Sequence, residues 1–384
     1  MRPRILCISF SDISADARVL RQIAVLAEFG EVTTVGYGSK PEGASHHLEI
    51  ESSLPSLPQT LAGVALLTLR LYRRVEFLAP AVRRALELAQ GDWDLVVANE
   101  ARALPLARRL AGPHIPVWGD MHEWAPEERV HVLSWKLLIK PFMTWVCARH
   151  LPHAAAVSVV NDSIAALYRA EFGVQTVTVR NARRLVDLEP SPMQPDSIRL
   201  VHSGAAVPGR NLEGMMQAVG MLGSGYSLDL YLVPARDGGR YKSQLEDLAR
   251  GFGNVRLLPP VAPDDLPAVL NAYDVGIFSL PPQTRNHALM LPNKFFDFVQ
   301  ARLCIVFSPS PETSRLIEQF ELGAIAEDFS PEALAAAIGS LRREDIAKYK
   351  QNAHQSARAL SSETDEEVER SLLRNLLPSA AQIS

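Results

Sequence analysis

The sequence predicts an α/β protein with two doubly wound parallel sheets. Short apolar runs alternate with segments of helical periodicity along most of the chain, as in parallel strands connected by helices. This alternation stops at a proline-rich stretch and then starts again, and 384 residues suit two domains of ordinary size. The two halves are therefore expected to share one architecture.

The first domain is expected to open with a strand, a helix and a second strand. Residues 5–10 form an apolar run, apolar residues from Val19 to Ala27 repeat at helical spacing, and Gly30 ends that helix before a strand at 31–35. Further elements are predicted from the same signals: strands at 95–98, 115–119, 155–160 and 176–179, and helices at 103–110 and 163–170.

The clearest break in the chain is a linker at residues 186–197. Three prolines occur in the seven residues 189–195, and no periodicity is present there. The predicted domains are therefore residues 1–185 and 198–350, followed by a helical tail at 351–384. In the second domain we expect strands at 199–203, 227–233, 255–258, 274–278, 303–307 and 324–326, and helices at 211–222, 241–250 and 292–301.

Composition excludes several classes of protein. A net charge of −4 argues against nucleic-acid binding, and no apolar stretch approaches the length of about 18 residues that a membrane span needs. Cys7, Cys147 and Cys304 are widely spaced among apolar neighbours, which predicts buried, reduced thiols in a cytoplasmic protein. No group of residues has metal-ligand spacing, so no metal or other cofactor is expected. The first loop contains no glycine, which excludes a dinucleotide-binding dehydrogenase.

Ligands of doubly wound sheets bind at the carboxyl ends of the strands, so the residues that follow each strand are the candidates. In the second domain, the stretch after residue 201 contains Ser203, Gly204 and Arg210 and leads into a helix near Asn211. Glycine allows a close approach of the backbone, and an arginine beside a helix start favours a phosphate. An ordinary turn with a surface arginine is the alternative.

A stronger signal follows the strand at 274–278. Pro292 suits the first position of a helix, and Lys294 then projects from its opening turn. Asp297 lies on the same face three residues later. Lys294 is expected to neutralise a diphosphate, while the carboxylate of Asp297 accepts hydrogen bonds from ribose hydroxyls. The alternative, a simple surface ion pair of Lys294 and Asp297, fits less well with the preceding loop, the proline and the position in the fold.

The first domain is expected to supply the acceptor side. Asp120, His122 and Glu123 follow the strand at 115–119 and would lie at its carboxyl end. His122 either orients the sugar, or forms a hydrogen bond with the acceptor, or is a structural histidine. Asp12 and Asp16 lie in the first loop; Asp16 is expected to cap the first helix, and Arg18 could face the phosphates.

These segments resemble the retaining family-4 glycosyltransferases of the GT-B fold. The resemblance covers about residues 1–350 and rests on Asp16-Ala17-Arg18-Val19, Asp120-Met121-His122-Glu123, Ser203-Gly204 with Arg210, and the stretch from Leu291 to Phe298. It implies two Rossmann-like domains that face each other across a cleft. It also implies donor binding by Ser203, Gly204, Asn293 and Asp297, catalytic roles for Arg210, Lys294 and His122, and acceptor-side roles for Asp120, Glu123, Asp12 and Arg18.

The family's pair of glutamates is altered here, since Leu289 takes the first position and Asp297 the second, and Met215 and Met216 stand where the family often has a lysine. The resemblance implies transfer of a sugar from a nucleoside diphosphate sugar to a hydroxyl or amine of a glycan, a lipid-linked or a small-molecule acceptor, with retention at the anomeric carbon. The rival hypotheses are a sugar-nucleotide epimerase and a non-catalytic sugar-nucleotide-binding partner.

Two segments raise the question of a membrane surface. Residues 130–148 combine Trp135, Lys136, Lys140, Phe142 and Trp145 with aliphatic residues, and residues 61–88 are apolar with five arginines. Aromatic residues with lysines are typical of a membrane interface. Peripheral contact with the inner membrane surface is one interpretation, and a buried or acceptor-covering helix is the other.

Overall fold

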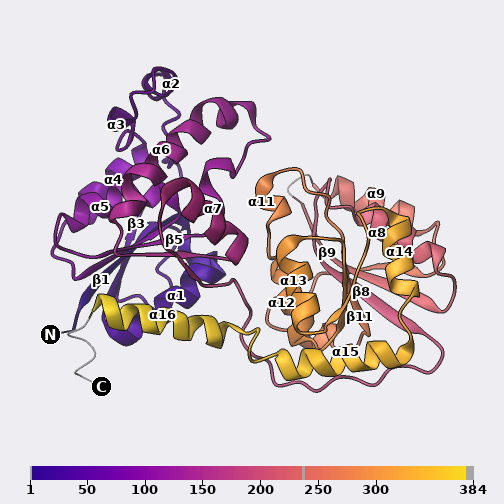
Figure 1. Cartoon of the computed structure of the whole chain (residues 1–384). Helices are drawn as coiled ribbons and strands as arrows, with labels where there is room; N and C mark the ends of the chain where they lie inside the picture. Colours follow the sequence, from indigo (N-terminus) through magenta and orange to yellow (C-terminus); the bar gives the residue numbers. More distant parts are fainter. Residues whose placement is uncertain (1, 236–237, 378–384) are drawn as a thin grey trace. The chain divides into compact units, whose positions relative to one another are not determined.

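The computed structural model describes residues 2–235 and 238–377 and divides them into two compact units. Unit 1 holds residues 2–181, 284–286 and 365–377, and unit 2 holds the rest of the described chain. Each unit contains one parallel sheet with helices on both of its faces (Figure 1). The predicted fold class, two doubly wound α/β domains, is confirmed.

The sheet of unit 1 has the order β3-β2-β1-β4-β5-β6-β7. Its strands are β1 (Arg4–Asp12), β2 (Glu31–Tyr37), β3 (His46–Glu49), β4 (Leu95–Asn99), β5 (Val117–Met121), β6 (Ala156–Val159) and β7 (Val177–Thr178). The order reverses between β1 and β4, which run side by side. In such sheets this switch point, at the carboxyl ends of the strands, is where ligands bind.

The helices of unit 1 connect these strands and cover the sheet. They are α1 (Ala17–Phe29), α2 (Leu61–Thr68), α3 (Tyr72–Val75), α4 (Pro80–Leu88), α5 (Leu104–Ala111), α6 (Lys140–His150) and α7 (Asp162–Phe172). Short turns lie between them: η1 (Ile13–Ala15), η2 (Ala101–Ala103), η3 (Ala125–Glu127), the π-helical η4 (Trp135–Ile139) and η5 (Leu151–His153).

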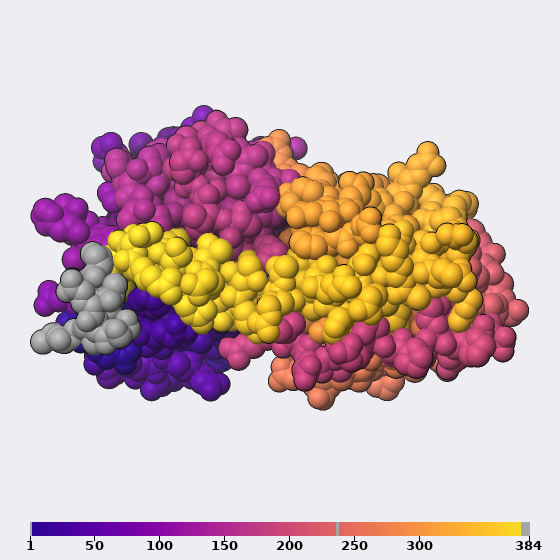
Figure 2. All heavy atoms as spheres, turned by 60° about the horizontal axis from the view of Figure 1, so that its bottom comes forward, coloured from indigo at the N-terminus to yellow at the C-terminus, as the bar shows by residue number. Residues whose placement is uncertain are grey.

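The C-terminal helix completes unit 1. Helix α16 (Ser362–Leu376) begins in unit 2, and from Asp365 onward it belongs to unit 1. Leu372, Leu373 and Leu377 join a buried cluster with residues of β1 and α1. Figure 2 shows this yellow helix lying against the indigo residues of the N-terminal region. The C-terminal part of α16 is thus in the same core as β1 and α1.

The sheet of unit 2 has the order β10-β9-β8-β11-β12-β13, with a switch point between β8 and β11. Its strands are β8 (Ile198–Ala206), β9 (Tyr226–Pro234), β10 (Val255–Leu258), β11 (Val275–Phe278), β12 (Cys304–Phe307) and β13 (Gly323–Ile325). Cys304 and Val306 pack in one buried cluster, while Ile305 and Phe307 pack in another. Alternate residues of β12 therefore face opposite sides of a sheet that is covered on both faces.

The remaining helices follow the strands of unit 2. They are α8 (Leu212–Met221), α9 (Arg240–Ala249), α10 (Leu266–Leu270), α11 (Arg285–Ala288), α12 (Asn293–Gln300), α13 (Pro311–Gln319), α14 (Pro331–Gly339) and α15 (Arg343–Ser356). The predicted tail at 351–384 contains, as far as residue 377, the end of α15 and the whole of α16. Its residues 378–384 lie outside the described chain.

Three predicted boundaries near the candidate site are wrong. Strand β8 continues past the predicted end at Ser203 to Ala206, because its ladder with β9 extends to the pair Ala206–Pro234. Asp120 lies inside β5, where it pairs with Asn99 of β4, and does not follow the strand. Pro292 has extended backbone angles and is the N-cap of α12, whose first helical residue is Asn293.

The predicted cap of the first helix and the predicted burial of the cysteines are confirmed. The side chain of Asp16 accepts a hydrogen bond from the Val19 backbone and caps α1. The structure shows the same arrangement at α7, where Asn161 accepts a hydrogen bond from the backbone of Ile164. The three cysteines are buried free thiols. Within the described residues, no helix combines the length and the apolar character needed to cross a membrane.

Candidate functional site

In unit 2, the candidate residues gather at the carboxyl ends of β8 and β11. His202, Ser203 and Gly204 belong to the last part of β8, and Lys294 comes from the first turn of α12. The Nζ atom of Lys294 lies 4.5 Å from the centre of the Phe278 ring, at the end of β11. A Cβ atom placed on Gly204 would lie 3.4 Å from this Nζ. The structure thus brings Gly204 and Lys294 together, two residues that are 90 positions apart in the sequence.

The surroundings of Lys294 lower its pKa and so disfavour the charged form of its side chain. Its side chain is half-buried, and burial followed by the nearby charge of Arg210 lowers the pKa of Lys294 to about 8, although the carboxylate of Asp297 opposes the shift. Because burial and Arg210 disfavour the ammonium form, an anionic ligand stabilises this form more than it stabilises the ammonium group of an exposed lysine. Arg210 itself is exposed on the turn before α8.

His202 is a site residue that the sequence did not single out. Its ring is buried and stacks on Phe278, and Nδ1 lies 3.0 Å from the backbone oxygen of Ile277. Burial, then the charge of Lys294, lowers the pKa of His202 to about 3, so the ring is neutral. Because Nδ1 donates to Ile277, Nε2 is an acceptor, and it would lie 3.6 Å from a Cβ on Gly204.

The absence of a side chain at Gly204 leaves room between Lys294 and His202. We expect Gly204→Ala to lower the affinity for a nucleoside diphosphate by about tenfold or more, because the methyl group occupies the space beside the ammonium. The backbone of Gly204 has a φ angle of +155°, which an alanine rarely adopts, so the variant should also lose about 1–3 kcal/mol of stability through backbone strain. Isothermal titration calorimetry measures the affinity, and thermal unfolding measures the strain.

Gly223→Ala is the matched control for this variant. Gly223 also has a positive φ, of +79°, but a Cβ there meets no heavy atom within 4 Å. It should lower stability without changing nucleotide affinity. Equal affinities for the two variants would contradict a ligand-binding role for the space at Gly204.

Asp297 has a partner that the sequence did not reveal. Its buried side chain accepts a hydrogen bond from Nε of Arg183 at 2.6 Å, and NH1 of Arg183 donates to the backbone oxygen of Pro263 at 2.7 Å. Burial raises the pKa of Asp297, and Arg183 followed by Lys294 opposes that rise. Arg183 thus links α12, through the ion pair, to the residues after β10, through the hydrogen bond to Pro263. The ribose contact of Asp297 stays a prediction.

The other donor-side residues differ in exposure. Ser203 is buried in β8, whereas Asn293 is exposed at the start of α12. Neither Pro292, the N-cap residue of α12, nor Asn211, the N-cap residue of α8, forms a side-chain cap hydrogen bond. Met215 and Met216 are fully buried, so the position where the family often has a lysine cannot reach a ligand in this conformation.

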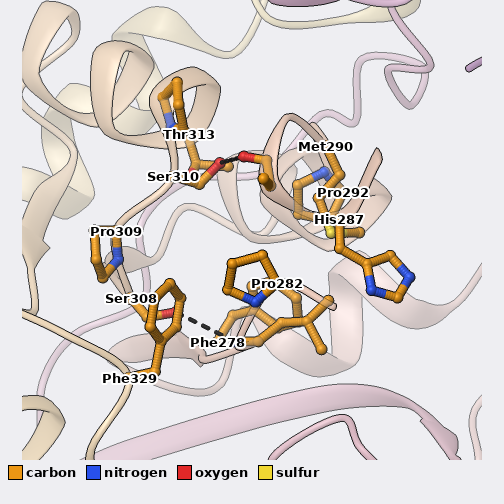
Figure 3. A pocket seen from close by; sticks show the side chains of 13 residues that line it. Phe278, Pro282, His287, Met290, Pro292, Ser308, Pro309, Ser310, Thr313 and Phe329 are labelled. Carbon is orange, nitrogen blue, oxygen red and sulfur yellow. Dashed lines mark hydrogen bonds between the residues drawn. The ribbon is translucent and has the colours of Figure 1, made fainter. Parts of the chain in front are cut away.

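A pocket of about 110 Å³ opens beside these residues in unit 2 (Figure 3). It is lined by Phe278, whose ring lies next to Lys294 Nζ, by Pro292, and by the segments that follow β11 and β12. Its wall is mainly apolar, with hydroxyl groups from Ser308, Ser310 and Thr313. Ser308 Oγ accepts from the backbone of Leu280 at 3.2 Å. The pocket is large enough for only part of a ligand such as one ring.

In unit 1, Asp120 is the centre of a buried polar network. Arg18 binds both of its carboxylate oxygens, at 2.8 and 2.7 Å, and Ser158 donates to it at 2.5 Å. Burial alone would raise the pKa of Asp120, but Arg18 and His122 hold it well below its usual range. The third nitrogen of the Arg18 guanidinium, NH1, donates a hydrogen bond to the Val179 backbone oxygen at 2.9 Å. These contacts give Arg18 a partner inside unit 1, and they do not present it to a phosphate.

The same network fixes the orientation of His122. Its Nε2 lies 3.2 Å from Asp120 Oδ2 and 3.1 Å from Asn99 Oδ1, so Nε2 carries the proton and donates it to these acceptors. Its Nδ1 lies 3.9 Å from Glu100 Oε1. Asp120 and Arg18 therefore act as positioning residues behind the imidazole.

His122 lines a pocket of about 160 Å³ with Glu100, Arg102, Glu123 and Glu128. Desolvation, followed by repulsion from Glu128 and Glu100, raises the pKa of Glu123 to about 7. Glu100 has φ of +66° at the end of β4, an uncommon backbone conformation for a residue with a side chain. A pocket with these carboxylates can accept hydrogen bonds from hydroxyl groups.

Asp12 neither lines this pocket nor hydrogen-bonds to the network of Asp120. It is exposed at the end of β1, and its Oδ1 accepts a hydrogen bond from Ser14 Oγ at 2.7 Å. No group of three or more His, Cys, Asp or Glu residues within the described chain could hold a metal ion.

Comparison with known proteins identifies the family. The model of the glycosyl transferase 4-like domain matches residues 15–182, and the model of glycosyl transferases group 1 matches residues 198–344. The two models together match more than half of the chain, which therefore belongs to the glycosyltransferases with these two domains. No curated protein sequence matches the chain.

Solved structures of glycosyltransferases share its fold along nearly the whole chain. The chain is similar to Anabaena HepE in complex with UDP and glucose, with 14% identity, a TM-score of 0.70, and 97% of this chain and 100% of that chain covered. Sucrose-phosphate synthase from Thermosynechococcus elongatus gives 16% identity, a TM-score of 0.71, and coverage of 98% and 100%. Both likenesses support the GT-B fold.

Proposed function

We propose that the protein transfers a hexosyl group from a nucleoside diphosphate sugar, with retention of the anomeric configuration. The observation that carries this proposal is the space at Gly204, bordered by the ammonium of Lys294 and the neutral ring of His202. Uridine is the base we favour, because HepE was solved with UDP and glucose, and an Escherichia coli trehalose-6-phosphate protein was solved with UDP-2-fluoro glucose.

Positive charge at this space would stabilise the departing diphosphate. When the bond between the anomeric carbon and the phosphate oxygen breaks, the electron pair stays on that oxygen. Lys294, Arg210 and the positive ends of the α12 and α8 helix dipoles can lower the energy of the resulting charge. We propose that these groups replace a metal ion in the reaction.

Retention constrains where the acceptor approaches. Without a covalent intermediate, the acceptor oxygen must bond to the anomeric carbon on the face that the diphosphate leaves. The departing phosphate oxygen is then the nearest base, and it takes the acceptor proton. Unit 1 would orient the acceptor through the pocket of His122, where Nδ1 and the carboxylates accept hydrogen bonds from its hydroxyl or amine groups.

A two-stage assay tests this proposal. Thermal shift in a panel of nucleoside diphosphates identifies the base, since a bound ligand raises the apparent stability. The matching sugar nucleotides are then incubated with hydroxyl and amine acceptors, with and without EDTA, and the linkage is assigned by NMR. We expect a product with the donor's anomeric configuration and turnover that EDTA does not change.

Other results would overturn particular parts of the proposal. An inverted linkage would contradict retention, and loss of turnover with EDTA would contradict metal independence. Epimerised donor without an acceptor would indicate an epimerase. Tight nucleotide binding without turnover would indicate a binding partner.

A further inference from the structure

Large apolar side chains are exposed together on one part of unit 1. Of the ten that are exposed within residues 2–235 and 238–377, seven come from two short segments. Leu61 is 92% exposed and Leu133 is 68% exposed. We call these seven residues the apolar patch: Leu61, Val64, Leu69, Leu71, Val132, Leu133 and Leu137. A soluble surface normally scatters such residues singly.

The two segments lie side by side in the fold. Helix α2 packs beside η4, and the short helix α3 follows α2 directly. Tyr72 of α3 anchors this region, because its ring packs on Phe142 and Trp145 of α6, each at 5.7 Å. The seven side chains therefore belong to one region of a single unit and do not come from separate parts of the chain.

Helix α2 cannot be explained as a helix that buries an apolar face. Its sequence, Leu-Ala-Gly-Val-Ala-Leu-Leu-Thr, has no charged residue, and only Gly63 and Leu67 are buried. A helix that is apolar on all sides normally lies in a core or in contact with lipid. Since most of α2 faces outward, something other than this unit is expected to cover it.

The surroundings of the patch are positively charged. Arg70, Arg73, Arg74 and Lys136 are exposed, and no described acidic side chain forms an ion pair with them. The sequence contains no aspartate or glutamate at residues 52–75 or 129–161. An apolar surface with a basic rim complements a layer of anionic headgroups above hydrocarbon.

The aromatic residues expected at a membrane interface do not form this surface. Trp135 and Phe142 are buried, and Trp145 is half-buried against Tyr72 and Phe142. Aliphatic side chains are exposed in their place. The exposed apolar residues therefore lie in the two segments that the sequence indicated, but the side chains that can contact lipid are aliphatic and not aromatic.

We propose that the apolar patch docks unit 1 on the surface of an anionic lipid bilayer. The leucines would enter the boundary between headgroups and acyl chains, and the four cations would contact the headgroups. A second copy of the chain fits less well, because it would bring two sets of these cations together. The inference does not depend on the proposed reaction.

Flotation with lipid vesicles tests the docking. The full chain is mixed with vesicles of phosphatidylcholine alone or with about 30% phosphatidylglycerol. We expect binding to the anionic vesicles only. The reason is that each basic residue near an anionic surface raises the partition coefficient about fivefold. Leu61→Glu and Leu133→Glu should each lower that coefficient at least tenfold, and 0.5 M NaCl should also lower it.

Met221→Glu is the matched control, because Met221 is 55% exposed but lies in unit 2 on α8. It should leave flotation unchanged. Thermal unfolding of all three variants checks that they are folded, and turnover of the donor on a soluble acceptor checks the reaction separately. Failure of the protein to float, equal flotation of Leu133→Glu and wild type, or dimers that Leu133→Glu dissociates would each overturn the proposal.

Discussion

Lys294→Ala should reduce turnover by about a hundredfold or more while leaving the fold intact. Removal of one group that stabilises developing charge typically costs a factor of about 10²–10³. The side chain is half-buried at the start of α12, with its Nζ above the Phe278 ring, and it is not part of the buried core. Initial rates at saturating donor measure the effect, and thermal unfolding verifies the fold.

The pH profile makes this prediction specific to the ammonium group. Because burial and Arg210 lower the pKa of Lys294 to about 8, the free protein loses this charge as the pH rises through 8. We expect kcat/KM for the donor to fall above that pH, since this ratio reports the free enzyme. Lys294→Arg keeps its charge, so its profile should stay flat in this range.

Lys348→Ala is the control for a lysine of unit 2 away from the site, since Lys348 is exposed and pairs with Glu321. It should have wild-type turnover. If Lys294→Ala were within threefold of wild type, the assignment of the leaving-group site would be wrong. A wild-type profile without a decline above pH 8 would contradict the role of the charged form.

Asp120→Ala should lower the free energy of unfolding by about 3–5 kcal/mol, because it leaves the guanidinium of Arg18 buried without its partner. Urea denaturation at neutral pH measures this loss. Asp120 has a depressed pKa, so its contribution is present above the carboxylate's ordinary pKa and is lost as the pH falls through the folded-state value. The difference between the variant and wild type should therefore shrink in strong acid.

Two comparisons separate a buried network from an ordinary ion pair. Asp247→Ala breaks the exposed pair with Arg250 and should change stability by less than about 1 kcal/mol. Arg18→Met combined with Asp120→Leu removes both charges and should be more stable than Asp120→Ala alone. If the double variant were as unstable as the sum of the two single variants, the ion pair would not be the cause.

The architecture was predictable because central parallel strands are continuous apolar runs. The same signal fails where hydrogen bonding continues into polar or small residues. The apolar run of β8 ends near Val201, yet its ladder with β9 includes Gly204 and Ala206. The edge strand β3, whose sequence is His-His-Leu-Glu, was not predicted, because it has no apolar run.

The candidate site was predictable only in part. Strand order places the residues after β5 and β11 at the correct edge of each sheet, and this suffices to select His122 and Lys294. It does not reveal which side chains pair with each other. Arg18 and Asp120 are 102 residues apart, and Arg183 and Asp297 are 114 apart, so no local pattern links them. His202 was overlooked because a histidine inside a strand looks structural until its neighbours are known.

The position of α16 has a consequence for biosynthesis. Leu372, Leu373 and Leu377 complete a core that begins at Ile5, so the N-terminal half cannot reach its final packing while α16 is still inside the ribosome. All of unit 2 is translated before that closure. During translation of unit 2, the apolar surface that α16 later covers on the N-terminal domain is therefore exposed. Exposed apolar surface of this kind is where chaperones commonly bind growing chains.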